Sequence, residues 1–207
     1  MTTHVTQVAN EATTTTEERV TPFAARALAA LRIAFGLTFL WAFFDKLFAL
    51  GFSTGRSVNP ETGVETVDRF GDAAWIHGHS PTEGFLAFGA DGPFKGIYND
   101  IAGATWADWL FMLGLFAIGV AFILGIGMRL AAAAATVMMA LMWAAEWPLD
   151  KTTSGGEPSM STNPITDYHF IYAVTGIVLA MTYAGHTWGL GKWWASLPLV
   201  QKNRWLI

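Results

Sequence analysis

Ionisable side chains stand at the ends of four apolar stretches of the chain. Carboxylates and an imidazole are groups that enzymes commonly use as general acids and bases. Asp167 and His169 are two residues apart, at the start of the last apolar stretch, and Glu146 closes the stretch before it. The candidate catalytic residues are Asp45, Lys46, Asp108, Glu146, Asp167 and His169.

Large aromatic residues accompany the acid–base groups. Trp143 and Trp147 flank Glu146, and Tyr172 follows His169 by three residues. Flat rings beside proton-transferring groups suit the proton-coupled reduction of a quinone, so Trp143, Trp147 and Tyr172 are candidate quinone-binding residues. The same acid–base set would equally suit a pathway for anions or protons.

The histidine pair of the long polar segment is a weaker metal candidate. His77 and His79 offer two imidazoles, and the spacing fixes no third ligand. Protein metal sites normally need three or four ligands, so we expect no metal site here.

The stretch from Trp106 to Trp147 determines how the ionisable groups are placed. Trp106–Ile126 has 21 residues and Leu130–Trp147 has 18. At about 1.5 Å per residue, each can cross a hydrocarbon core of about 30 Å, the second only just. Because only Gly127, Met128 and Arg129 connect them, the two helices must be antiparallel. The sequence therefore predicts a transmembrane hairpin.

Two further apolar stretches complete an all-α, four-helix transmembrane bundle. We expect a long extracytoplasmic loop between helices 1 and 2, and an amphipathic C-terminal segment in the membrane interface. Residues 1–23 are polar and Thr-rich, which is typical of a disordered cytoplasmic tail. The predicted parts are a tail (1–23), a membrane domain (24–187) with spans near 24–50, 106–126, 130–147 and 165–184, and the interfacial segment (188–207).

Composition agrees with a membrane protein and excludes several kinds of chemistry. Hydrophobic residues make up 53% of the chain and charged residues 14%, whereas a soluble domain carries about 25% charged residues. The cysteine count is zero. Disulfides, thiolate-held iron–sulfur clusters, c-type haem attachment and a cysteine persulfide are therefore excluded within this chain.

Three local patterns predict packing. Ser80, Pro81 and Glu83 have the spacing of a helix start, with Ser80 as the N-cap and Glu83 as its capping-box partner. The glycines of the hairpin allow close helix approach: Gly114, Gly119, Gly125 and Gly127. Arg32, near one end of the first span, is either a topology anchor or a buried partner for a carboxylate or an anionic ligand.

The distribution of charge sets the orientation. Four spans place both termini on one side, with seven basic residues there and five on the other side. Cytoplasmic loops are enriched in Lys and Arg, and the short connector carries Arg129. Of the 16 acidic residues, 13 fall on the opposite side. We expect a multi-pass protein of the cell membrane with both termini in the cytoplasm.

All four helices then bring ionisable groups to one depth beneath the external loop. Exposing such groups to lipid costs a few kcal/mol each, so they should face the bundle interior or water. A shared polar cup at the outer mouth would satisfy them together. The alternative is that each charge reaches the headgroup region separately.

From residue 24 onward the chain resembles the DoxX/DoxD group of four-helix membrane proteins, and within it those described as the large subunit of thiosulfate dehydrogenase (quinone). The strings that carry the resemblance, in order, are LRIAFGLTFLWAFFDKLF, GHSPTEGFLAFG, GPF, DWLFMLGLFAIGVAFILGIGMRLAA, MWAAEWP, NPITDYHFIYA and GLGKWW with LPLV. The resemblance implies electron transfer from thiosulfate to membrane quinone as acceptor, giving tetrathionate, with a small partner subunit.

Individual roles follow from chemistry within those strings. Lys46 would attract the thiosulfate anion, and Glu146, Asp167 and His169 would relay protons to quinone. Arg32 and Arg129 would fix topology or packing. Glu83 is a further candidate site residue. A non-catalytic membrane scaffold that docks redox or detoxifying enzymes is the alternative, and a small-solute or proton pathway the third possibility. Expected partners are membrane lipid and a small subunit, a soluble redox enzyme or a second copy, and not nucleic acid.

Overall fold

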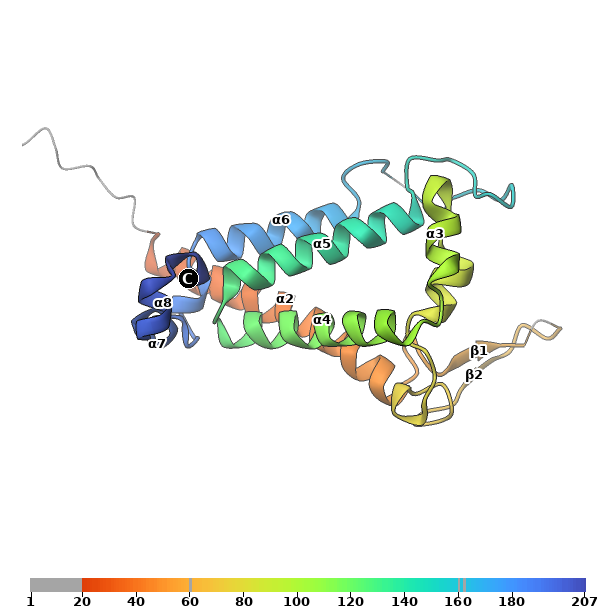
Figure 1. Ribbon diagram of the computed structural model, residues 1–207, viewed down its shortest axis with the longest axis horizontal. Coiled ribbons are helices and arrows are strands. Elements are labelled where there is room, and N and C mark those ends of the chain that lie inside the picture. The colour runs from red at the N-terminus through yellow and green to blue at the C-terminus, as the bar shows by residue number, and fades with distance from the viewer. Residues whose placement is uncertain (1–19, 60, 160, 162) are drawn as a thin grey trace, which may run out of the picture.

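The computed structural model describes residues 20–59, 61–159, 161 and 163–207. Most of the predicted tail, residues 1–19, lies outside the described residues. The body of the protein consists of four apolar helices, which are α2 (Pro22–Phe48), α4 (Thr105–Leu124), α5 (Met128–Glu146) and α6 (Tyr168–Met181) (Figure 1). Three of them, α2, α4 and α5, are long and apolar enough to cross a membrane. The predicted helical fold is thereby confirmed, and the three long apolar helices suggest a membrane protein.

Helix α6 is shorter than the predicted span 165–184. The side-chain carbonyl of Asn163 accepts hydrogen bonds from the backbone N–H groups of Ile165 and Thr166, which holds those residues in a turn. Helix α6 then ends before Tyr183, which has a left-handed φ of 52°. At about 1.5 Å per residue, its 14 residues extend about 21 Å, so a fourth crossing stays a prediction.

The helices pack as two pairs, α2 with α4 and α5 with α6. A tight turn at Gly125 and Gly127, both with positive φ, joins the pairs. The pairs lie close together at the end that carries this turn and the C-terminal segment, and they diverge toward α3 (Lys95–Asp100) (Figure 1). We call the first the inner end and the second the outer end.

An aromatic core holds the pairs together. The ring of Phe35 in α2 packs edge-on against Phe122 of α4 at 4.7 Å between centroids and against Tyr172 of α6 at 6.0 Å. Backbones of α2 and α4 touch at two glycines: a Cβ on Gly36 would lie 2.9 Å from the Gly119 carbonyl oxygen, and one on Gly119 would lie 3.0 Å from that of Gly36. Close approach at Gly119, predicted from the sequence, is confirmed.

The outer loop has more structure than the sequence indicated. It contains an antiparallel hairpin, β1 (Arg56–Val58) with β2 (Glu65–Val67), in which Arg56 pairs with Val67. Short turns follow: η1 (Trp75–His77), the π-helical η2 (Phe85–Gly89), η3 (Gly92–Phe94) and α3. The Ser80 hydroxyl accepts the Glu83 N–H at 3.1 Å, so the predicted cap forms ahead of this single π turn.

Short elements of the C-terminal segment cover the inner end. They are η4 (Ala184–His186), α7 (Gly191–Ser196), α8 (Pro198–Lys202) and η5 (Arg204–Leu206) (Figure 1). The backbone N–H of Leu190 donates to the Leu124 carbonyl at 2.8 Å, which fastens the segment to the last turn of α4.

Candidate acid–base site at the outer end

Four side chains from the ends of α5 and α6 form a connected acid–base group. Asp167 is the N-cap of α6, where its Oδ1 accepts the Phe170 N–H, and its Oδ2 lies 2.7 Å from His169 Nδ1. On the other side of the ring, His169 Nε2 lies 3.9 Å from Glu146 Oε1. That oxygen accepts the Tyr168 hydroxyl at 2.8 Å. We call Glu146, Asp167, Tyr168 and His169 the outer acid–base group.

The imidazole is the most enclosed member of the outer acid–base group. The His169 side chain is 1% exposed, and its Nε2 has no hydrogen-bond partner among the described residues. If Nδ1 carries the proton toward Asp167, Nε2 presents a lone pair toward the Glu146 carboxylate. Buried polar atoms are normally satisfied, so this nitrogen is available to exchange a proton or to bind a ligand.

Glu146 and Tyr168 connect this imidazole to the surface. The Glu146 side chain is partly exposed and Tyr168 is exposed. The Tyr168 hydroxyl and the Glu146 carboxylate therefore lie between solvent and the buried ring, with 3.9 Å between Glu146 Oε1 and His169 Nε2. Tyr168 was not among the sequence candidates, because a contact across 22 residues and two helices gives no local signal.

Trp143 and Trp147 lie next to Glu146 at the end of α5. Their rings are 5.7 Å apart, and Trp147 also packs against Phe94. A Cβ on Gly92 would meet the Trp147 ring at 2.3 Å, so only glycine fits there. The buried Nε1 of Trp143 has no hydrogen-bond partner among the described residues. Tyr172, the third residue predicted to bind quinone, packs edge-on both against Tyr168 at 6.2 Å and against Phe35 of the aromatic core at 6.0 Å.

Backbone bonds from the outer loop fix this end of α5. The Asp91 N–H donates to the Ala145 carbonyl at 2.7 Å, and the Tyr98 hydroxyl donates to that of Leu141 at 2.8 Å. The Asp91 carboxylate accepts the Ser154 N–H, which ties the two outer loops together. Hydrogen bonding from Ser154 holds the pKa of Asp91 below its ordinary value.

Asp45 and Lys46 form hydrogen bonds with the loop that follows α2. The buried Asp45 carboxylate accepts the backbone N–H groups of Phe52, Ser53 and Thr54 and the Ser53 hydroxyl, at 2.6 to 3.1 Å. The Lys46 ammonium donates to the same Ser53 hydroxyl at 3.3 Å. Both groups therefore have local partners.

Asp108 lies in a third environment. Its Oδ1 accepts the Ser80 and Thr82 hydroxyls at 2.7 and 2.6 Å, which docks the turn after η1 onto the start of α4. Of the six sequence candidates, the structure joins Glu146, Asp167 and His169, and it gives Asp45, Lys46 and Asp108 separate partners. A single cup holding all six stays a prediction.

His77 and Arg129 have structural partners. His77 Nδ1 lies 2.8 Å from the Gly71 carbonyl, and no group of three metal-ligating side chains occurs among the described residues. The Arg129 guanidinium donates to the Tyr183 hydroxyl and the Arg204 carbonyl, both at 3.2 Å.

Arg32 is fully buried at the inner end. Its guanidinium donates to the carbonyls of Phe122 and Ile123, with the second at 2.6 Å, and to the Trp188 carbonyl at 2.9 Å. The last carbonyls of a helix lack intrahelical donors and carry partial negative charge, so a cation satisfies them well. Of the two hypotheses for Arg32, the structure shows the buried side chain. The partners of the guanidinium are backbone carbonyls rather than a carboxylate.

Comparisons of the chain with family models, with curated proteins and with solved structures gave no match. The resemblance to the DoxX/DoxD group therefore depends on the sequence strings quoted above. It enters the proposal below together with the geometry of the outer acid–base group.

Proposed function

We propose that this protein is a four-span membrane protein of the DoxX/DoxD type and a subunit of a quinone-linked oxidoreductase. In this proposal it passes electrons from thiosulfate, or a related reductant, to membrane quinone. The observation that carries the proposal is the orphan Nε2 of His169, buried between Asp167 and Glu146 at one end of an apolar bundle.

Quinone reduction needs two electrons and two protons, and the outer acid–base group fits the proton half of that chemistry. Protonated His169 would donate from Nε2 to a quinone oxygen, while Asp167 stabilises the imidazolium. Glu146 and Tyr168 would return a proton from the exposed side. The second orphan donor at the end of α5, Trp143 Nε1, suits a quinone carbonyl, which accepts hydrogen bonds.

The distribution of charge supports separate roles for this chain and a partner subunit. The outer half of the described chain holds 13 acidic and five basic residues. A strongly negative surface repels a thiosulfate dianion, and Lys46, the predicted anion-attracting residue, is bound to Ser53. We therefore assign proton and quinone chemistry to this chain, and oxidation of two thiosulfates to tetrathionate to the partner.

The test is thiosulfate-dependent quinone reduction by membranes that contain this chain and its partner. We expect His169→Gln to lower kcat by about 100-fold, since a positioned general acid contributes about 10²–10⁴-fold. His77→Gln is the matched control, because this exposed imidazole bonds a loop carbonyl far from α6. It should leave kcat unchanged.

Two results would contradict the proposal. One is wild-type membranes that reduce no quinone with thiosulfate supplied; the other is a His169→Gln variant as active as His77→Gln. If Glu146→Gln and His169→Gln instead leave co-purification with a soluble oxidoreductase intact and change no rate, the scaffold alternative is favoured.

A further inference from the structure

The surface of the inner end is positively charged throughout the part of the chain that the structure describes. All acidic side chains of the described residues belong to the outer half of the helices or to the outer loops. Apart from the buried Arg32, the basic side chains of the inner end are Arg26, Arg129, Lys192, Lys202 and Arg204.

Tryptophans accompany these cations on the C-terminal segment. Trp188, Trp193 and Trp205 are 61%, 55% and 59% exposed, although indole rings are among the largest apolar groups in proteins. Exposed Trp beside Lys and Arg is typical of elements at the boundary between headgroups and acyl chains. The composition therefore places the inner end at the headgroup level of one leaflet.

A hollow of about 180 Å³ opens at this level between the start of α2 and the turn after α6. The wall formed by α2 is apolar, with Ala25 and Leu28, and the opposite wall carries polar groups. The residues around the hollow are Val20, Ala25, Leu28, Thr182, Tyr183, Ala184, His186 and Thr187. One apolar and one polar wall match a ligand that has both an acyl chain and a headgroup.

Basic side chains lie close to residues of the hollow. The Arg129 guanidinium donates to the Tyr183 hydroxyl at 3.2 Å, and Arg26 is exposed next to Ala25 in the chain. The His186 ring packs against the Tyr183 ring in a tilted arrangement, with 5.5 Å between the centroids. Burial, and secondarily Lys192, lowers the pKa of His186, which leaves a neutral ring able to donate one hydrogen bond.

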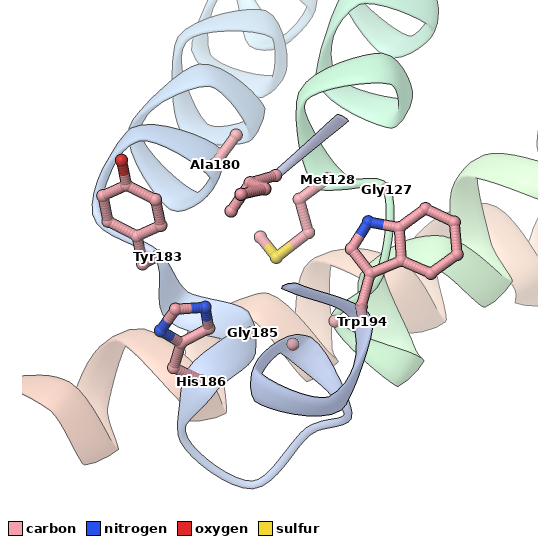
Figure 2. Close-up of a pocket in the computed structure, with 10 residues that line it drawn as sticks. Gly127, Met128, Ala180, Tyr183, Gly185, His186 and Trp194 are labelled. Atoms are coloured by element: carbon pink, nitrogen blue, oxygen red, sulfur yellow. The ribbon is translucent and has the colours of Figure 1, made fainter. Parts of the chain in front are cut away.

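The far side of Tyr183 and His186 is filled by protein. There, Met128, Ala180, Gly185 and Trp194 close around a space of about 20 Å³, room for about one water molecule (Figure 2). A ligand of lipid size is thereby restricted to the side that faces α2.

We infer that the hollow between α2 and the Thr182–Thr187 turn binds one anionic phospholipid of the surrounding leaflet. Its acyl chain lies along Ala25 and Leu28, and its phosphate lies near Arg26, Lys192 and His186. A free phosphate would gain nothing from the apolar wall, and a zwitterionic lipid would gain little from the unopposed cations. The inference depends on the membrane position of the helices and not on quinone chemistry.

The experiment is native mass spectrometry of the full chain in mild detergent, with dioleoylphosphatidylglycerol or dioleoylphosphatidylcholine added. Wild-type protein should retain one phosphatidylglycerol at least tenfold more often than phosphatidylcholine. Ala25→Phe fills the hollow and should reduce that retention at least tenfold. Ala27→Phe is the matched control, because Ala27 is exposed in the same turn and does not line the hollow.

Charge is tested without changing the shape of the hollow. Arg26→Gln with Lys192→Gln should lower phosphatidylglycerol retention at least threefold, whereas Arg56→Gln with Lys151→Gln, at the outer end, should not. Equal retention in Ala25→Phe and Ala27→Phe, or equal retention of the two lipids by wild type, would overturn the inference. Because lipid retention is measured without thiosulfate or quinone, its failure is distinguishable from failure of the proposed function.

Discussion

At the scale of single residues, burial separates groups that look alike in the sequence. Arg26 and Arg32 lie two turns apart on α2, yet the first is exposed and the second binds the last carbonyls of α4. Asp45 and Glu146 both end apolar helices, but Asp45 accepts four local hydrogen bonds whereas Glu146 lies 3.9 Å from His169 Nε2, which has no hydrogen-bond partner among the described residues. The type of a residue predicts its chemistry, and its neighbours decide whether that chemistry is free for use.

Replacing Arg32 by Leu should destabilise the protein by about 3 kcal/mol, because buried carbonyls left without donors cost about 1–3 kcal/mol each. For a chain of this size the loss corresponds to a Tm lower by about 10 °C, measured by thermal unfolding in detergent. Arg26→Leu should change stability by less than about 0.5 kcal/mol, as exposed substitutions usually do. Similar Tm values for the two variants would show that Arg32 does not hold α4 and the C-terminal segment together.

At the scale of elements, small residues decide how the helices cross. Gly36 and Gly119 bring the backbones of α2 and α4 into contact, and Gly114 lies only against the flexible end of Met138. The sequence indicated Gly119 and Gly114 equally, as small residues in an apolar helix. Gly36 was not singled out, because its partner lies on a helix more than 80 residues away.

Gly36→Ala should lower stability by about 2 kcal/mol, within the about 1–3 kcal/mol typical of overpacking. The new methyl would meet the Gly119 carbonyl and the Ile123 N–H at 2.9 Å, and backbone cannot move aside as a side chain can. Gly114→Ala is the control inside the same membrane domain, since the terminal methyl of Met138 can rotate away. Unfolding midpoints in the same detergent compare the two, and a larger loss for Gly114→Ala would contradict this account of the crossing.

At the scale of the whole molecule, the distribution of charge and the course of the helices favour the same membrane topology. Helix α6 runs back alongside α5 to the inner end, where η4 packs near the start of α2 (Figure 1). Among the described residues the inner end carries six basic and no acidic side chains, and the outer end carries five basic and 13 acidic ones, which favours a cytoplasmic inner end. Because α6 runs from the outer end back to the inner end, we favour it as a fourth membrane crossing, although it has only 14 residues.

The cysteine-free chain makes this topology directly testable. Ser57→Cys places a thiol on the outer hairpin, and Ser196→Cys places one at the end of α7. A membrane-impermeant maleimide should label Ser57→Cys in intact cells and Ser196→Cys only after permeabilisation. Labelling of both in intact cells would mean that α6 does not cross, and labelling of Ser196→Cys alone would mean that the orientation is reversed.

The sequence by itself determined the helical membrane fold and three of its long helices to within about two residues at most ends, because uninterrupted apolar runs of that length have few other stable states in lipid. It also determined a local feature that needs only neighbours in the chain, the Ser80 cap. It did not indicate the short β-hairpin or the end of α6 at Met181, which depend on individual turn residues.

The tertiary structure decided which of the candidate groups meet. Asp108 joins two loop hydroxyls, Glu146 joins His169 and Tyr168, and Arg32 joins α4 and the C-terminal segment. These contacts link residues 22 to 156 positions apart in the chain. Helical periodicity fixes the face on which a side chain lies, but not the rotation of one helix against another or the path of a loop over their ends. The helix rotations and loop paths depend on side-chain packing across the whole bundle. The same packing sets the surroundings of the His169 imidazole and the Arg32 guanidinium.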